Sequence, residues 1–305
     1  MRFFWLNFHV DYACRHSGAC CSAGWPIPVE TDRAIQITQI TDHPDWLVPA
    51  IGAPDDVAGT LAMRPGGHCV FHRDDRCGIY HARPSSCSHF PYVCVIDPRG
   101  VHVTLSHYCP TAAAMLFDRP RPIAIVEGPA PPTGLDLPEG LDARDALPPL
   151  ASANRLMSWH EFSAWEEHAV GTVGAHGAHG LGRFESARAA VPHSQAAWPE
   201  APRDHQHISQ RLVAPAWPSF EPVITRYLAA KAFASWAAYL NDDGTAAVVR
   251  AVETARAVLH VEAVRQCAEV NRMLDAPLLT AAIRQSDLLL VHYADTRVLS
   301  SASSP

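Results

Sequence analysis

The chain has 305 residues, of which 48% are apolar and 18% charged, and its formal net charge at pH 7 is -7. The apolar share is large enough to bury a core, which excludes a disordered chain, and the acidic excess argues against nucleic acid or an anionic membrane as a partner. Apolar runs are too short to cross a bilayer, and the first residues lack the features of a signal peptide. We therefore expect a cytoplasmic protein.

Cysteines dominate residues 1–118, which we expect to form a metal-binding domain. Eight of the nine cysteines lie in this part of the chain. In a reducing cytosol such a cluster is more typical of metal ligands than of disulfides. The candidate metal ligands are Cys14, Cys20, Cys21, Cys69, Cys77, Cys87, Cys94 and Cys109.

Regular structure in this first region is confined to short segments. Residues 92–96 and 101–105 are rich in β-branched side chains and are separated by Asp97-Pro98-Arg99-Gly100, which predicts a β-hairpin. The rest is expected to be irregular and held together by its metal. Residues 119–150 carry eight prolines, which predicts an extended connector on the surface.

Residues 151–300 are predicted to form a helical domain. Apolar residues at helical spacing predict helices over 152–170, 222–240, 245–274 and 277–290, the last three forming an antiparallel bundle. Between them, the Gly, His and Pro residues of 171–218 predict a long loop. The expected fold is therefore α+β and mostly α, with an irregular, metal-stapled N-terminal half and a C-terminal antiparallel helical bundle.

The cysteine spacing bears on the identity of the metal. The chain contains no C-x2-C pair, which is the usual feature of structural zinc sites, so a zinc ribbon or finger is disfavoured. Iron–sulfur clusters accept wider spacing and are held by thiolates, as the adjacent Cys20 and Cys21 on a tight turn could provide. We therefore favour an iron–sulfur cluster of the 4Fe-4S type, with zinc as the alternative.

Several of these segments together resemble a known family. They are Cys14, Cys20-Cys21, Cys69-Val70-Phe71, Cys77-Gly78-Ile79-Tyr80, Arg83-Pro84, Cys87 and Phe90-Pro91. This run is similar to a bacterial cysteine-cluster family of zinc- or iron-chelating domains. Within that family, residues 20–27 and 105–110 resemble the branch that contains flagellin lysine-N-methylase. The resemblance covers residues 12–117 and implies an iron–sulfur cluster, S-adenosylmethionine as a cofactor and a protein lysine as the methyl acceptor.

The chain departs from the family pattern at Ser17, where a further cysteine usually stands three residues after the first. A serine hydroxyl is a poor cluster ligand. Cys94 is additional to the motif, and with it the count reaches eight, enough for two four-thiolate sites. Without Cys94, seven cysteines leave one open coordination position for a substrate or S-adenosylmethionine, and the sequence leaves both arrangements open.

Other chemistry-bearing residues receive structural interpretations. Cys267 lies close to an apolar helical stripe and is predicted to be a buried thiol outside the site. Arg83 is predicted to hydrogen-bond backbone carbonyls beside Pro84. Four histidines flank ligand cysteines and are interpreted as ordinary exposed or hydrogen-bonded side chains: His68, His72, His81 and His89.

Two functions compete at this point. In the first, the cluster forms a site for S-adenosylmethionine-dependent methylation of a protein lysine, an activity that the resemblance alone implies and for which the sequence identifies no catalytic residue. In the second, the chain is a non-enzymatic zinc- or iron-binding module with a structural, metal-handling or redox-sensing role, and its helical part binds a protein partner. In both, the thiolate ligands contribute folding energy directly.

Overall fold

The computed structural model describes residues 1–49, 52, 54–118, 121–134, 137–174, 180–190, 198–240 and 242–296. The chain divides into two compact units. Unit 1 comprises residues 1–12, 93–129 and 140–305, and unit 2 comprises residues 13–92 and 130–139. Among the described residues, no helix has the length and apolar character that a membrane span requires.

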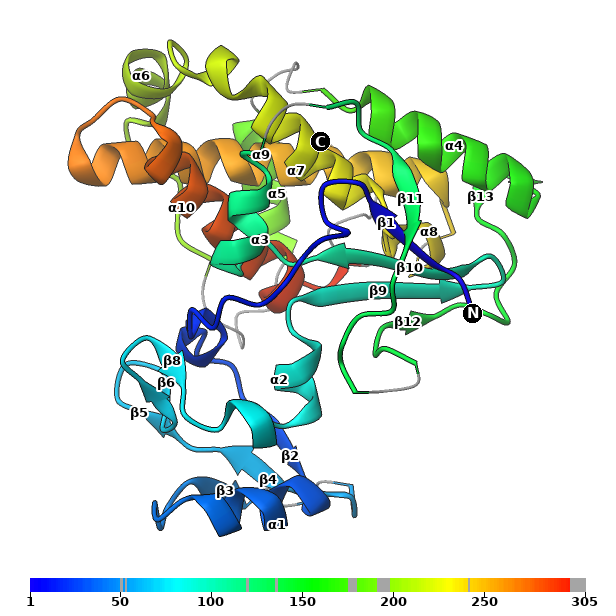
Figure 1. Ribbon diagram of the computed structural model, residues 1–305. Coiled ribbons are helices and arrows are strands. Elements are labelled where there is room, and N and C mark those ends of the chain that lie inside the picture. The colour runs from blue at the N-terminus through cyan, green and yellow to red at the C-terminus, as the bar shows by residue number, and fades with distance from the viewer. Residues whose placement is uncertain are drawn as a thin grey trace. The chain divides into compact units, whose positions relative to one another are not determined.

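Unit 1 contains a five-stranded sheet in which the N-terminal strand lies between two others (Figure 1). The strand order is β11-β1-β10-β9-β12, and β1 runs parallel to β10 but antiparallel to β11. The predicted hairpin is confirmed, since β9 and β10 are neighbours joined by Pro98 and Arg99. The strands are β1 (Phe3–Leu6), β9 (Tyr92–Asp97), β10 (Gly100–Leu105), β11 (Ile125–Gly128) and β12 (Leu141–Asp142).

The remainder of unit 1 is mainly helical, which confirms the predicted α+β class. The long helix α9 packs against α5, α7, α8 and α10. The helices are α3 (Pro110–Met115), α4 (Trp159–Thr172), α5 (Leu181–Ala190), α6 (His205–Ile208), α7 (Glu221–Ala232), α8 (Ala237–Leu240), α9 (Thr245–Val270) and α10 (Ala276–Asp287). Three shorter helical segments are the π-helical η3 (Ser209–Val213) and η5 (Leu288–Tyr293) and the 3-10 turn η4 (Trp217–Phe220). A two-stranded ribbon is formed by β13 (Leu150–Ser152) and β14 (Arg155–Leu156).

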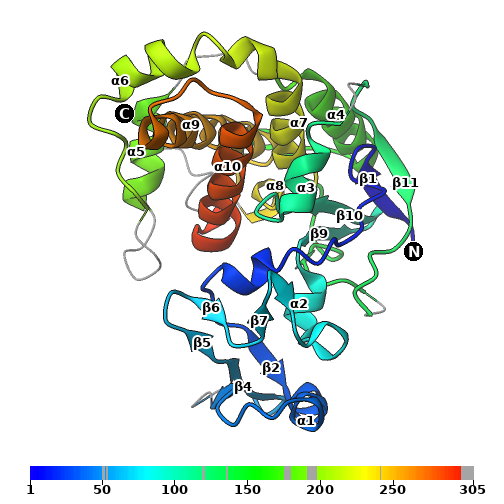
Figure 2. The same cartoon turned by 60° about the vertical axis from the view of Figure 1, so that its left-hand side comes forward.

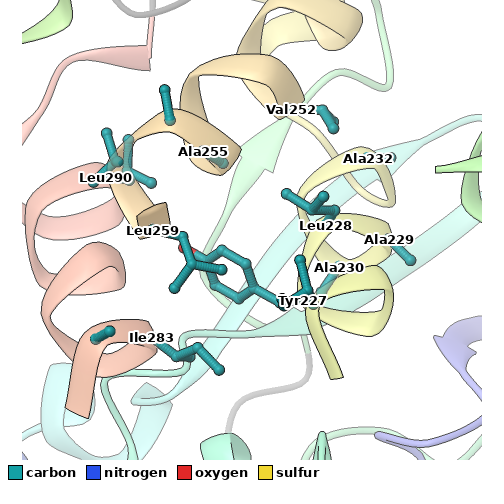
Figure 3. Packing of buried hydrophobic residues seen from close by; sticks show 14 of the residues in the cluster. Tyr227, Leu228, Ala229, Ala230, Ala232, Val252, Ala255, Leu259, Ile283 and Leu290 are labelled. Carbon is teal, nitrogen blue, oxygen red and sulfur yellow. The ribbon is translucent and has the colours of Figure 1, made fainter. Parts of the chain in front are cut away.

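The core of unit 1 lies where α7, α9 and α10 meet. Tyr227 and Leu228 of α7, Leu259 of α9 and Ile283 of α10 are fully buried and face one another (Figure 3). Burying an aliphatic side chain of this size contributes about 1.5–3 kcal/mol relative to leaving it exposed. The apolar spacing read from residues 222–290 therefore identifies the face on which these helices pack.

The loop predicted over 171–218 is corrected by the structure. Within this segment, residues 175–179 and 191–197 lie outside the described residues, and α5, α6, η3 and η4 occupy much of the rest. Helix α5 forms because Phe184 is fully buried beside α9 and contacts the ring of Trp198. Pro199, Pro202 and Pro215 lie outside these helices, and Pro218 lies in the first turn of η4, where a missing N–H costs no helical hydrogen bond.

The helix predicted over 222–240 is divided into α7 and α8. Ala234 has a left-handed backbone (φ 52°), and its N–H donates to the buried carboxylate of Glu166 at 3.3 Å. A side chain of α4 thus replaces the helical acceptor at this point, and local propensity is overridden by a tertiary hydrogen bond. Similarly, α4 begins at Trp159 and not at 152, because Ser158 and Glu161 form a capping box.

The proline-rich segment 119–150 supplies edge strands to the sheet of unit 1. Strand β11 pairs with β1, and β12 pairs with β9, so the two strands lie at opposite edges. Edge positions suit a segment rich in proline, because a missing N–H there costs no ladder hydrogen bond. Residues 130–139, between these strands, belong to unit 2.

Unit 2 is built from short strands and single helical turns. A three-stranded sheet in the order β2-β4-β3 is covered by α1 (Figure 2). Its elements are β2 (Pro28–Glu30), α1 (Thr31–Ile40), β3 (Leu47–Pro49) and β4 (Val57–Leu61). Two ribbons follow, β5 (Met63–Arg64) with β6 (His68–Cys69) and β7 (His72–Arg73) with β8 (Arg76–Cys77), together with the turns η1 (Ala19–Ser22) and η2 (Tyr80–Ala82) and the helix α2 (Ser85–His89).

A buried polar network joins the first and last elements of unit 1. Asp287 is fully buried, and its carboxylate lies 2.6 Å from Nζ of Lys231, the only lysine of the chain, and 3.2 Å from Nδ1 of His107. Tyr227 donates its hydroxyl to Asp287 at 2.9 Å, and Nε2 of His9 lies 3.2 Å from Nε2 of His107. Burial alone would raise the pKa of Asp287, but Lys231 and His107 outweigh burial and hold it well below its usual range.

This network predicts that unit 1 loses stability in mild acid. Burial lowers the pKa of His9 and of His107 and brings that of His292 to about 4, whereas an unfolded histidine titrates near pH 6.5. Below that pH the unfolded chain therefore binds protons that the folded chain excludes. The free energy of unfolding should fall by up to about 1.4 kcal/mol per pH unit for each such histidine.

Denaturant titrations between about pH 8 and pH 5 measure this slope. The variant His9→Gln should show a smaller slope than the wild type. His207→Gln, which changes an exposed histidine on α6, is the matched control and should leave the slope unaltered. Equal slopes for all three proteins would contradict the assignment of these buried neutral histidines.

Candidate metal centre

Five cysteines of unit 2 lie on separate short elements. Cys20 and Cys21 form the turn η1, Cys69 ends β6, Cys77 ends β8, and Cys87 lies in α2. None of these elements is longer than five residues, so the thiols lie on short strands and single helical turns and not on a long helix. Cys21 and Cys69 are buried, and the other three are partly buried.

The Cys21 thiol is the centre of this group. The thiols of Cys20, Cys69 and Cys77 act on it more strongly than burial does, and together they raise the pKa of Cys21. In turn, the Cys21 thiol lowers the pKa of Cys77 to about 7 and also lowers the pKa of Cys20 and of Cys69. The unit thus gathers thiols that ionise easily, which is the form in which cysteine binds metals.

Cys87 lies beside the same group with a different protonation preference. Burial raises its pKa, and the negative charge of Cys20, Cys77 and Cys69 raises it further. Cys87 is therefore held as a neutral thiol as long as its neighbours carry the charge. A bound cation would reverse this balance, because metal coordination favours the thiolate.

The thiols surround Cys21 and not a common empty point. Accordingly, within the described part of the chain no three His, Cys, Asp or Glu side chains are arranged as preformed ligands of one metal ion. The donor chemistry nevertheless fits a thiophilic metal, since four interacting thiols and a fifth beside them are gathered in one small unit. Binding requires the thiol side chains to rotate until their sulfurs face the metal.

The turn that carries Cys20 and Cys21 depends on Gly18. This residue caps η1 with a left-handed backbone (φ 65°), and its carbonyl accepts from the N–H of Cys21 at 2.9 Å. A methyl group at this position would lie 2.6 Å from Nε2 of His72 and 2.8 Å from the carbonyl oxygen of Asp75. Only glycine combines this conformation with this close approach.

Arg83 is a cation that acts on three of the thiols. Its charge lowers the pKa of Cys20, Cys77 and Cys87, although in each case another effect is larger. The guanidinium is fixed by a bond from Nε to Oγ of Ser88 at 3.1 Å and by the ring of Tyr80 at 4.0 Å. Among the described residues no carboxylate forms an ion pair with it. Arg83 therefore serves as a counter-charge to the thiolates, and the carbonyl contacts expected from the sequence are replaced by Ser88 and Tyr80.

The remaining candidate ligands lie elsewhere. Cys14 belongs to unit 2 but is exposed, and its sulfur accepts from the N–H of His16 at 3.4 Å. Cys94 and Cys109 belong to unit 1. Cys94 is fully buried in β9 and burial raises its pKa to about 12, whereas the Cys109 sulfur lies 3.4 Å from the hydroxyl of Tyr12. Cys267 is a buried core thiol of α9, as predicted.

These features define a cysteine-rich metal-chelating module. Residues 13–110, about a third of the chain, match the family CxxCxxCC, described as "Putative zinc- or iron-chelating domain". The match supports metal binding by this part of the chain. The family name contains a cysteine where this chain has Ser17, which is exposed. Comparison with curated proteins and with solved structures finds no match.

Two side chains beside this group are not indicated by the sequence. Arg83 is expected to bind backbone carbonyls, and the sequence signal for its role is the Tyr80-x-x-Arg83 spacing on a tight turn before Cys87. His72 is expected to be an ordinary histidine. Its cross-strand pairing with Cys77 could have been read from the short turn 73–76 between them.

The contacts of Gly18 predict that Gly18→Ala disrupts the centre. The methyl group would strain the backbone and displace His72 or the Asp75 carbonyl, which we expect to cost about 2 kcal/mol or more of stability and most of the bound metal. Gly24→Ala is the matched control, because Gly24 has a similar φ of 79° but no neighbour closer than 3.9 Å. Thermal unfolding together with metal analysis measures both effects. Equal losses in the two variants would show that backbone strain alone matters.

The position of Arg83 predicts that its charge strengthens metal binding. In Arg83→Met the thiols lose their counter-charge, and we expect metal affinity to fall by about tenfold, equivalent to one pKa unit at a single thiol. Arg83→Lys keeps the charge and should retain most of the affinity. Competition with a coloured chelator measures the constants. Equal losses in both variants would assign Arg83 a purely structural role.

Proposed function

We propose that unit 2 is a metal-binding module whose thiols hold an iron–sulfur cluster. The observation that carries the proposal is the grouping of thiols around Cys21, where Cys20, Cys69 and Cys77 from three elements of the chain act on its thiol. Cys87 is the fifth donor of the group. Thiols with lowered pKa gathered in this way are the ligand set that iron–sulfur clusters use.

The spacing of the donors favours a cluster over a single ion. The cysteines of a structural zinc ion usually come in C-x2-C pairs, which this chain lacks. Adjacent cysteines such as Cys20 and Cys21 suit a larger cluster, whose irons are bound at different corners.

Zinc is the second candidate, and one observation favours it. Cys21 and the three thiols that act on it form a group of four thiols, the number found in a four-cysteine zinc site. In this arrangement Cys87 would remain a neutral thiol beside the ion. An iron–sulfur cluster contains acid-labile sulfide and a zinc site does not, so sulfide analysis distinguishes the two candidates.

The metal also has a structural role in this proposal. The buried core of unit 2 is small and includes Cys21 and Cys69 among its members. A unit of this size with few buried apolar residues needs further stabilisation, and metal–thiolate bonds supply it directly. Chelation of the metal should therefore destabilise unit 2.

Methyl transfer is not part of this proposal. The resemblance to the methylase branch is its sole support, and the glycines that follow α4 are preceded by a helix, not by the strand that a nucleotide-binding turn requires. Calorimetric titration of the metal-loaded protein with S-adenosylmethionine tests the hypothesis directly. Saturable binding of S-adenosylmethionine would support the methyl-transfer hypothesis.

Metal and acid-labile sulfide analysis of the full-length protein, purified without oxygen, tests the proposal. We expect iron and sulfide in the wild type and at least a tenfold lower content in Cys21→Ser, because the central thiol is lost. Cys94→Ser is the matched control: its thiol is buried in unit 1, and the variant should keep its iron.

Each other result has a definite meaning. Zinc without sulfide would overturn the iron–sulfur assignment in favour of the second candidate. Iron that survives Cys21→Ser but is lost in Cys94→Ser would overturn the ligand set. A wild-type protein that takes up neither metal would overturn the proposed function as a whole.

A further inference from the structure

His72 lies on the same face of its ribbon as a thiol of the metal centre. In the β7–β8 pair, His72 is directly opposite Cys77, and residues paired in this way project their side chains to the same side. Both are partly buried, whereas Arg73 and Arg76, which form the next pair, are exposed. The imidazole therefore lies on the inner face of the ribbon with the Cys77 thiol.

One nitrogen of His72 is buried without a partner. Nε2 is shielded from solvent and, among the described residues, forms no hydrogen bond. It lies against Gly18, where an added methyl group would be only 2.6 Å away, and Gly18 caps the turn of Cys20 and Cys21. A buried polar atom without a hydrogen bond destabilises the folded state, so a bound partner at this nitrogen would be favourable.

The other nitrogen of His72 is oriented by a second histidine. Nδ1 of His72 lies 3.1 Å from Nδ1 of His68, and the two rings are nearly parallel, with 11° between their planes. His68 is exposed and can exchange its proton with water. When His72 donates its Nδ1 proton to His68, Nε2 carries a free lone pair. This is the arrangement by which a supporting group fixes the tautomer of a metal-binding histidine.

We infer that His72 is a nitrogen ligand of the metal held by the thiols of unit 2, through Nε2, and that His68 is its positioning residue. The inference rests on the proposed function and adds to it a mixed sulfur and nitrogen donor set. Imidazole ligation suits both iron and zinc, so the assignment is independent of which metal is bound. It also gives the buried nitrogen the partner that it lacks among the described residues.

Cobalt(II) titration of the metal-free, full-length protein without oxygen tests this inference. Cobalt(II) is the probe because its visible bands report the number of sulfur and nitrogen ligands. Wild type should bind cobalt with both donors. His72→Ala should bind at least tenfold more weakly with the nitrogen contribution lost, and His68→Ala should lose affinity by about tenfold through the misoriented ligand.

Two further variants keep the test decisive. His81→Ala removes an exposed histidine of η2 and is the matched control, which should bind as the wild type does. His72→Cys replaces the nitrogen donor by a thiol and should regain affinity over His72→Ala, with stronger sulfur-to-cobalt absorption. This recovery would not follow if His72 served only to pack against Gly18.

The outcomes separate this inference from the proposed function. If wild type and His72→Ala bind cobalt equally and with the same spectrum, the role of His72 is overturned and the thiol centre stands. If His72→Ala and His72→Cys lose affinity to the same degree, His72 acts by packing and the ligand assignment is again overturned. If the wild type binds no cobalt, both the centre and the inference are overturned.

Discussion

The structure of unit 2 depends on the packing of separate chain segments around the Cys21 thiol. Its helices and strands are too short to bury a large apolar face, and two of the residues in its buried core are themselves cysteines. The same thiols thus serve as core and as donor set. Three of them have a lowered pKa, so the metal-free centre gathers negative charge, which Arg83 offsets at Cys20 and Cys77 and Arg64 offsets at Cys69. A cation removes this repulsion, which makes folding and metal binding a single equilibrium.

Parts of the fold with a strong local signal could be predicted from the sequence. The hairpin of β9 and β10 follows from two alternating segments around a Pro-Arg turn, and α9 follows from a long apolar stripe. The failures have physical causes that lie outside each segment. Ala234 ends α7 because Glu166, far away in the sequence, accepts from its N–H. Helix α5 forms because Phe184 finds a buried position beside α9. Domain boundaries inferred from composition follow contiguous stretches of sequence. They therefore could not predict a unit that combines residues 13–92 with 130–139.

The candidate site was predictable in kind and less so in detail. Clustering of cysteines in one region predicts a thiol centre without knowledge of the fold, and the structure gathers Cys20, Cys21, Cys69, Cys77 and Cys87 in one unit. The separation of Cys94 from them could not be predicted, because it follows from the pairing of β9 in the sheet of unit 1. The positions of Arg83 and His72 also depend on contacts across turns, where spacing along the chain carries little information.

The insertion of unit 2 within unit 1 has a consequence for the order of events during synthesis. His9 follows strand β1 in unit 1, yet the polar network that it joins through His107 is complete only after Asp287 has left the ribosome. All the cysteines of unit 2 are made much earlier, by residue 87. Domains made early can fold before the rest of the chain is complete. The nascent protein therefore displays its thiols to the metal and redox conditions of the cell while its larger unit is still unfinished, and β1 finds its partners β10 and β11 only after the cysteines of unit 2 have been made.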